Sequence, residues 1–104
     1  MATPAYRVTV QRLKEAFYQL EPSEQDAYIK KNIELLRQTG GESILQMQCV
    51  SDTWKVAVMR YPDLDSAMKA SVIWNARNAR YVDTATYVGY EADAWSALAR
   101  SLGL

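Results

Sequence analysis

Two kinds of hydrophobic spacing alternate along the chain, and their order restricts the fold more than any other feature of the sequence. Four segments place apolar residues at every second position, which is typical of β-strands. They cover residues 6–14, 43–50, 54–61 and 81–90. Between them, residues 23–39 and 63–78 repeat apolar residues at helical spacing, and a third helical pattern follows the last strand. The sequence therefore predicts the order β-α-β-β-α-β with an additional C-terminal helix.

The predicted long helices carry recognisable end signals. We predict that Ser23, with an acidic residue three positions later, is the N-cap of the first helix and that Gly40-Gly41 ends it. Asp63, which follows a proline, predicts the N-cap of the second helix. The apolar stripe of this second helix consists of Leu64, Met68, Val72 and Ala76, and Ala67 and Ile73 widen it. Residues 15–22 keep large apolar side chains such as Phe17, which we expect to cover other parts of the protein.

This element order is that of the split βαβ unit of ferredoxin-like folds. The sequence thus predicts an α+β fold in which both long helices cover one face of an antiparallel sheet. The 104 residues, 49% of them hydrophobic, suffice for one core, so we expect a single domain over residues 1–104. Because helices usually cover the more apolar face, we expect six strand residues to be buried beneath them. These are Val8, Val10, Leu45, Met47, Val56 and Val58.

The other face of the predicted sheet is mixed in character. It carries Arg7, Thr9, Gln11, Ile44, Gln46, Gln48, Ala57, Met59 and Tyr61. Such a face is too apolar to be simply solvated and too polar to be a core. We therefore expect it to meet the same face of a second subunit and to enclose a partly polar cavity. If the first strand is inverted, Tyr6 and Arg12 replace Arg7 and Gln11 in that cavity.

The ionisable residues exclude several classes of function. Twelve Lys and Arg balance twelve Asp and Glu, so the chain lacks the positive field of nucleic-acid-binding proteins and of membrane-surface helices. It contains no histidine, which excludes Ser-His-Asp triads, Cys-His dyads and histidine-ligated zinc sites. We therefore expect no metal, no other cofactor, no nucleic acid and no membrane partner.

Cysteine content and hydropathy bear on the compartment. The only cysteine, Cys49, cannot form a disulfide within the chain. The sequence contains no charged-then-apolar leader and no run of about 18 apolar residues. These features predict a cytoplasmic protein.

In element order, and in the step Arg60-Tyr61-Pro62-Asp63 between the third strand and the second long helix, the chain resembles the dimeric α/β-barrel superfamily. It is similar above all to antibiotic-biosynthesis-monooxygenase-like and uncharacterised small members. The resemblance covers nearly the whole chain and implies a homodimer in which two sheets face one another. It also implies a pocket for a small organic ligand between the sheet and the helices of each subunit.

The resemblance also restricts the reactions that we expect the chain to catalyse. Histidine-dependent activities of the superfamily, such as heme degradation, do not carry over to a chain without histidine. Its cofactor-independent monooxygenases use Asn, Trp, Tyr and Arg side chains instead. Residues 74–81 contain all four types, and the resemblance implies roles for Trp74, Arg77, Asn78 and Tyr81.

Side chains of the mixed face and of the second long helix form the candidate substrate-binding set. It consists of Arg7, Thr9, Gln11, Gln46, Gln48, Met59, Tyr61, Trp74 and Arg77. Arg7 would point into the cavity or form a salt bridge across the dimer interface. The two glutamines would orient a substrate carbonyl or pair with their symmetry mates. Arg77 would bind a phenolate or carboxylate, or favour the negative end of its helix. Met59 and Trp74 would line an aromatic pocket or belong to the apolar core.

Tyr81, Asn78 and Asp83 are the candidate catalytic residues. A tyrosine such as Tyr81 or Tyr61 transfers a proton if burial or a nearby arginine shifts its pKa, and otherwise packs with a satisfied hydroxyl. Asp83 is the only carboxylate within a predicted strand. It would be a general base if it is half-buried, and a surface charge if its face is solvated.

These features predict a homodimeric protein that binds a small aromatic or polyketide-like molecule. Oxygenation, isomerisation and cyclisation without metal or flavin stay open as its reaction. The alternative is a non-enzymatic protein, namely a ligand carrier or a stress or accessory protein without a catalytic site.

Overall fold

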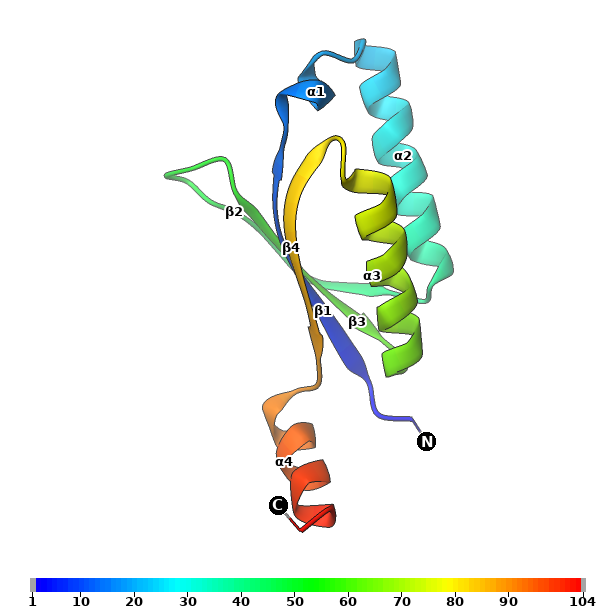
Figure 1. Ribbon diagram of the computed structural model, residues 1–104, viewed down its shortest axis with the longest axis vertical. Coiled ribbons are helices and arrows are strands. Elements are labelled where there is room, and N and C mark those ends of the chain that lie inside the picture. Colours follow the sequence, from blue (N-terminus) through cyan, green and yellow to red (C-terminus); the bar gives the residue numbers. More distant parts are fainter. Residues whose placement is uncertain (1, 104) are drawn as a thin grey trace.

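The computed structural model describes residues 2–103, and its elements follow the predicted order (Figure 1). The strands are β1 (Ala5–Leu13), β2 (Glu42–Gln48), β3 (Lys55–Tyr61) and β4 (Val82–Gly89). The helices are α1 (Glu15–Tyr18), α2 (Pro22–Gln38), α3 (Leu64–Asn78) and α4 (Ala92–Ser101). All strand pairs are antiparallel, in the order β2-β3-β1-β4. The predicted α+β class with a ferredoxin-like arrangement is thus confirmed.

The two long helices form a second layer on one face of the sheet. α2 and α3 lie side by side there, and α3 packs against β1, β3 and β4 (Figure 1). α4 extends past the end of the sheet, away from α2 and α3 (Figure 1). No helix within residues 2–103 is long and apolar enough to cross a membrane.

The helix starts follow local capping chemistry. As predicted, Asp63 caps α3, and its carboxylate accepts a hydrogen bond from the backbone N–H of Ser66 at 2.7 Å. The N-cap predicted for α2 is wrong, because that helix begins at Pro22 and its N-cap is Glu21 rather than Ser23. The fixed φ of a proline suits the first helical position, and this moves the start two residues earlier.

Apart from Ile44, the predicted division of the sheet into two sets of side chains is correct, but the helices cover the opposite set from the one expected. Arg7 pairs with Met59 and Thr9 pairs with Ala57, so these side chains share the helix-covered face. Arg7 and Thr9 are each only 2% exposed. The expectation that the apolar set is buried beneath the helices is therefore wrong. The expectation that the mixed face meets a second subunit is wrong as well, because α2 and α3 of the same chain lie over that face. The side chains that face away from the helices are Val8, Val10, Leu45, Met47, Val56 and Val58.

The exposure of these six side chains agrees with that orientation. Leu45 and Met47 are 51% and 53% exposed, and the four valines are only partly buried. Polar residues can lie on the helix-covered side because their side chains hydrogen-bond to one another there. They do not have to pack as an apolar core. The apolar side chains consequently form the outer surface of the sheet.

A β-bulge changes the predicted row on β2. Ser43 pairs with Met59 and Leu45 pairs with Val58, so Ile44 is an extra residue between them. Ile44 is 46% exposed and does not belong to the row of Gln46 that it was expected to join. The bulge places Ser43 in that row instead.

α3 turns a different side to the sheet than its apolar stripe predicts. Leu64, Met68 and Val72 are 40%, 49% and 66% exposed. The buried side of the helix consists of Ala67, Ala70, Ser71 and Asn78, of which only Ala67 belongs to the predicted stripe. Small side chains let the helix axis approach the bulky Tyr61 on β3, which is 1% exposed and belongs to the same buried cluster as the two alanines.

The segment between β1 and α2 contains the short helix α1, which the sequence did not predict as a helix. Phe17 is 3% exposed and covers one end of the protein as expected, whereas Tyr18 is 63% exposed. The Phe17 ring packs against that of Tyr28 on α2 at 5.9 Å between centroids.

Replacing Gly41 tests the packing of Tyr61. A Cβ at residue 41 would lie 2.8 Å from the Tyr61 ring, so Gly41→Ala should lower the free energy of unfolding by about 1–3 kcal/mol through overpacking. Gly89→Ala is the control, because a Cβ there meets nothing within 4 Å, and it should change stability by less than about 0.5 kcal/mol. Urea unfolding measures both, and equal stabilities of the two variants would contradict this account.

Candidate functional site

A pocket of about 550 Å³ lies between the helix-covered face of the sheet and α2. Its floor is polar and comes from β1, β2 and β3. The polar floor residues are Arg7, Thr9, Gln11, Ser43, Gln46, Gln48 and Lys55. Its opposite wall is mainly apolar, with Ile29, Ile33 and Leu36 of α2. Phe17 and Trp74 complete the wall from α1 and α3.

Arg7 is the most buried charged group of this floor. Its Nε donates a hydrogen bond to the Tyr61 hydroxyl at 3.1 Å, and its Nη1 donates to Thr9 Oγ1 at 2.7 Å. The guanidinium also lies 5.5 Å from the Trp74 ring centroid and 5.9 Å from that of Tyr61. Within residues 2–103 it forms no salt bridge. The surrounding side chains therefore hold the guanidinium in place without neutralising it.

The charges that line the pocket all have the same sign. Arg12, Arg37 and Lys55 join Arg7, and no Asp or Glu within the described part of the chain lines the pocket. Arg12 is paired with Asp83 at 3.6 Å, outside the pocket. In a chain with equal numbers of acidic and basic residues, this is a local concentration of positive charge.

A polar network joins α2 to α3 at the wall of the pocket. Asn78 is fully buried, and its Nδ2 donates to the Trp74 carbonyl at 2.8 Å. Its Oδ1 accepts from Asn32 Nδ2 at 3.0 Å and from the Tyr28 hydroxyl. Arg77 Nε donates to Asn32 Oδ1 at 2.8 Å. Two side chains of the pocket wall, those of Tyr28 and Asn32, are thus held in position from α3.

Burial raises the pKa of the Tyr28 hydroxyl above its usual value. The Arg77 guanidinium lies 5.4 Å from the Tyr28 ring centroid and opposes this shift. Tyr28 is therefore neutral near pH 7, and its proton is directed to Asn78. Tyr28 and Asn32 were not predicted as site residues.

Most of the predicted substrate-binding residues line the pocket. These are Arg7, Thr9, Gln11, Gln46, Gln48, Met59 and Trp74. Tyr61 and Arg77 do not line the pocket themselves but contact residues that do. The Tyr61 hydroxyl accepts a hydrogen bond from Arg7, and Arg77 donates one to Asn32. Because Arg7 and Gln11 are on the pocket side of β1, the inverted arrangement with Tyr6 in their place is wrong. Arg12 nevertheless reaches the pocket rim.

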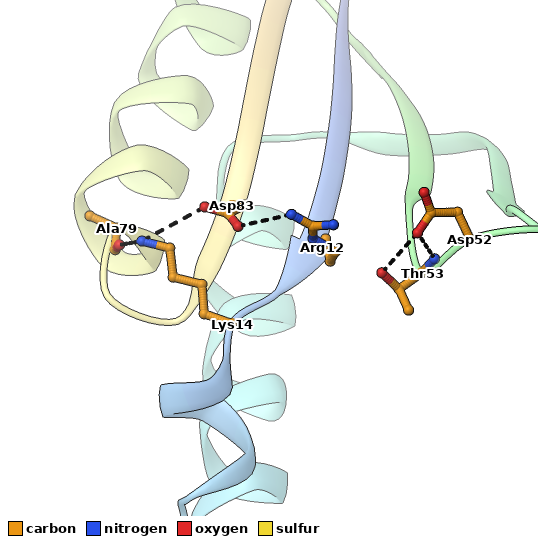
Figure 2. Close-up of polar contacts among 6 residues, drawn as sticks. All are labelled: Arg12, Lys14, Asp52, Thr53, Ala79 and Asp83. Carbon is orange, nitrogen blue, oxygen red and sulfur yellow. Dashed lines mark hydrogen bonds and ion pairs between the residues drawn. The ribbon is translucent and has the colours of Figure 1, made fainter.

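None of the three candidate catalytic residues lines the pocket. Asn78 belongs to the network behind the pocket wall, and Tyr81 packs edge-on against Tyr28 with 5.0 Å between ring centroids. Asp83 lies on the other face of the sheet, where it is paired with Arg12 at 3.6 Å and Lys14 at 3.9 Å (Figure 2). Its side chain is 47% exposed, so its position is that of a surface charge.

Two further polar features bear on what the pocket can hold. The Oε1 atom of Gln11 is buried without a hydrogen-bond partner, so the floor offers an unused acceptor. No group of three or more His, Cys, Asp or Glu within residues 2–103 is arranged to hold a metal ion. The pocket thus combines hydrogen-bonding groups on the side of the sheet with apolar side chains on the side of α2.

Comparisons with known proteins support the fold. No family model and no curated protein sequence matches the chain. Among solved structures, it is similar to MupZ from Pseudomonas fluorescens, with a TM-score of 0.55 and 14% identity over 99% of this chain and 80% of that one. It is also similar to a structural-genomics target from Agrobacterium tumefaciens, with a TM-score of 0.53 and 13% identity over 85% of this chain and 93% of that one. At these identities the likeness concerns the fold alone.

The network behind the pocket wall can be tested with two asparagines of α3. Asn78→Ala should lower the free energy of unfolding by about 2–4 kcal/mol, because it leaves a cavity and removes the acceptor of Tyr28 and Asn32. The exposed Asn75→Ala is the matched control, with a change of less than about 0.5 kcal/mol. Denaturant unfolding gives both values. A similar loss in the two variants would show that the network does not stabilise the fold.

Proposed function

We propose that the chain is a single-domain, homodimeric α/β-barrel protein that binds a small aromatic or polyketide-like molecule in the pocket of each subunit. The observation that carries this proposal is the pocket of about 550 Å³ between the polar sheet face and the apolar side of α2. Pockets for small organic ligands have volumes of this order, combine apolar walls with a few polar groups, and bury most of the ligand.

The uncovered face of the sheet supports a homodimer. Its centre carries Val8, Val10, Leu45, Met47, Val56 and Val58. A continuous apolar surface of this kind is usually covered by another protein surface. We expect this to be the same face of a second copy, as in the superfamily that the chain resembles.

The charges around this face fit a two-fold arrangement. At one end Arg60 pairs with Glu42 at 2.6 Å, and at the other Arg12 pairs with Asp83 at 3.6 Å. Each end of the apolar face thus carries both a positive and a negative side chain. Two copies can therefore meet face to face without placing like charges against one another.

α4 supports the same assembly. None of its residues is buried, and Trp95, Leu98 and Leu102 are 58%, 43% and 68% exposed. They form one apolar side of the helix, which extends past the sheet (Figure 1). In the proposed dimer this side packs against the partner subunit.

The composition of the pocket limits its chemistry. No histidine, cysteine or carboxylate within the described residues lines it, so it holds no side chain that is a ready general base near pH 7. Any oxygenation, isomerisation or cyclisation would proceed on a substrate that is itself acidic. None of Tyr81, Asn78 and Asp83 lines the pocket, and this favours the alternative of a non-enzymatic ligand carrier.

A charge in the centre of the apolar face tests the dimer. The wild type should have the mass of a dimer in light scattering after gel filtration, whereas Val56→Asp should be a folded monomer because the interface would have to bury its carboxylate. Val72→Asp, on the exposed side of α3, should remain dimeric. A monomeric wild type, or a dimeric Val56→Asp, would contradict the proposed interface.

Filling the pocket tests ligand binding. Ala57 is on the pocket floor, so Ala57→Trp should weaken the binding of a naphthalene-sized probe such as 2-naphthoate by about tenfold or more, measured by calorimetry. Ala76→Trp, on the exposed side of α3, should bind like the wild type. Native mass spectrometry of freshly expressed protein shows whether a small molecule is retained. If the wild type and the two variants bind the probe equally, it is not bound in this pocket.

A further inference from the structure

We propose that the ligand is a planar organic anion, a conjugated carboxylate or enolate, and that Arg7 binds its charged oxygens. This inference rests on the proposed function, because it specifies the ligand class of the same pocket. It adds that the ligand's charge, and not only its shape, is recognised.

The first argument is the burial of an uncompensated charge. Arg7 is 2% exposed, and its guanidinium forms no salt bridge within residues 2–103. Arginine is almost never fully buried unless it is paired, because removing a cation from water costs several kcal/mol. An anion bound in the pocket would offset that cost.

The second argument is the geometry of the guanidinium. It carries five N–H donors, of which the Tyr61 hydroxyl and Thr9 Oγ1 each accept from one. The remaining N–H groups have no acceptor within the described residues, and Arg7 lines the pocket. Two oxygens of a planar anion match such a fork, since a guanidinium binds them through parallel hydrogen bonds.

The third argument is the sign of the charge throughout the pocket. Arg37 and Lys55 also line it, and no carboxylate within residues 2–103 does. A cleft lined by one sign of charge concentrates ligands of the opposite sign. Trp74, whose ring lies 5.5 Å from the Arg7 guanidinium, also lines the pocket and adds an aromatic contact for a flat ligand.

Two matched pairs of probes distinguish charge from shape. The carboxylate pair is 2-naphthoate and neutral 2-naphthamide, and the enolate pair is 4-hydroxycoumarin, ionised near pH 7.5, and neutral 4-methoxycoumarin. Wild-type protein should bind the anion of at least one pair about tenfold or more tightly than its neutral partner, measured by titration calorimetry. The pair with the larger ratio identifies the source of the oxyanion.

Substitution of Arg7 assigns the preference to this side chain. Arg7→Met should bind both members of each pair with the weak affinity of the neutral probe, and Arg7→Lys should keep part of the preference because it retains the charge without the fork. Lys30→Met, on the exposed side of α2 and outside the pocket lining, should bind like the wild type. If Arg7→Met does not fold, Arg7→Lys carries the test.

Stability of the ligand-free protein separates a binding role from a structural one. Removal of a buried, unneutralised charge should leave the urea midpoint of Arg7→Met at or above that of the wild type. A lower midpoint together with an unchanged preference for the anion would assign Arg7 to the fold and overturn the inference. Equal binding of anion and neutral partner by the wild type would also overturn it, while the proposed function would stand. Failure of all four probes to bind would overturn both.

Discussion

The orientation of β1 is the constraint on which the rest of the arrangement depends, because it turns Arg7 and Thr9 toward the helices. There the Arg7 guanidinium donates hydrogen bonds to the Tyr61 hydroxyl and to Thr9 Oγ1. A row of arginine, threonine and glutamine cannot form a dry core with α2, so a pocket remains between them. Tyr61 can occupy its buried position because Gly41 leaves room for its ring. The pocket is thus a consequence of where the polar residues lie along β1.

The same arrangement explains the opposite surface. In an ordinary two-layer α+β domain, the apolar face of the sheet is buried by the helices and the other face is solvated. Here the alternation along β1 places Val8 and Val10 on the outer face once Arg7 and Thr9 face inward. No helix of residues 2–103 packs on that outer face (Figure 1), so only a second protein surface would bury it. The pocket and the apolar outer face are therefore two results of one orientation of the sheet, and a one-residue shift in register would remove both.

The element order and the two rows of side chains could be predicted from the sequence, because they depend on local spacing. The orientation of the sheet could not, since a period of two shows which residues share a face but not which face the helices cover. A signal was nevertheless present in α3, where Ala67, Ala70 and Ser71 form a side small enough to approach a sheet. The bulge at Ile44 has no comparable signal, because its position depends on pairing with β3. Tyr28 and Asn32 were missed because the apolar repeat of α2 alone explained that helix.

The orientation of Arg7 also connects the two functions that were open from the sequence. A guanidinium that binds an enolate or phenolate lowers the pKa of the corresponding acid, and so raises the fraction of ligand that is ionised near pH 7. An electron-rich anion is the form that reacts with oxygen or rearranges, so an enzyme without a general base in its pocket would use this interaction to generate its reactive species. A carrier would use the same interaction to retain an acid that is otherwise soluble in water. In either function Arg7 would bind the anion, and the two functions would differ in the reactivity of that anion.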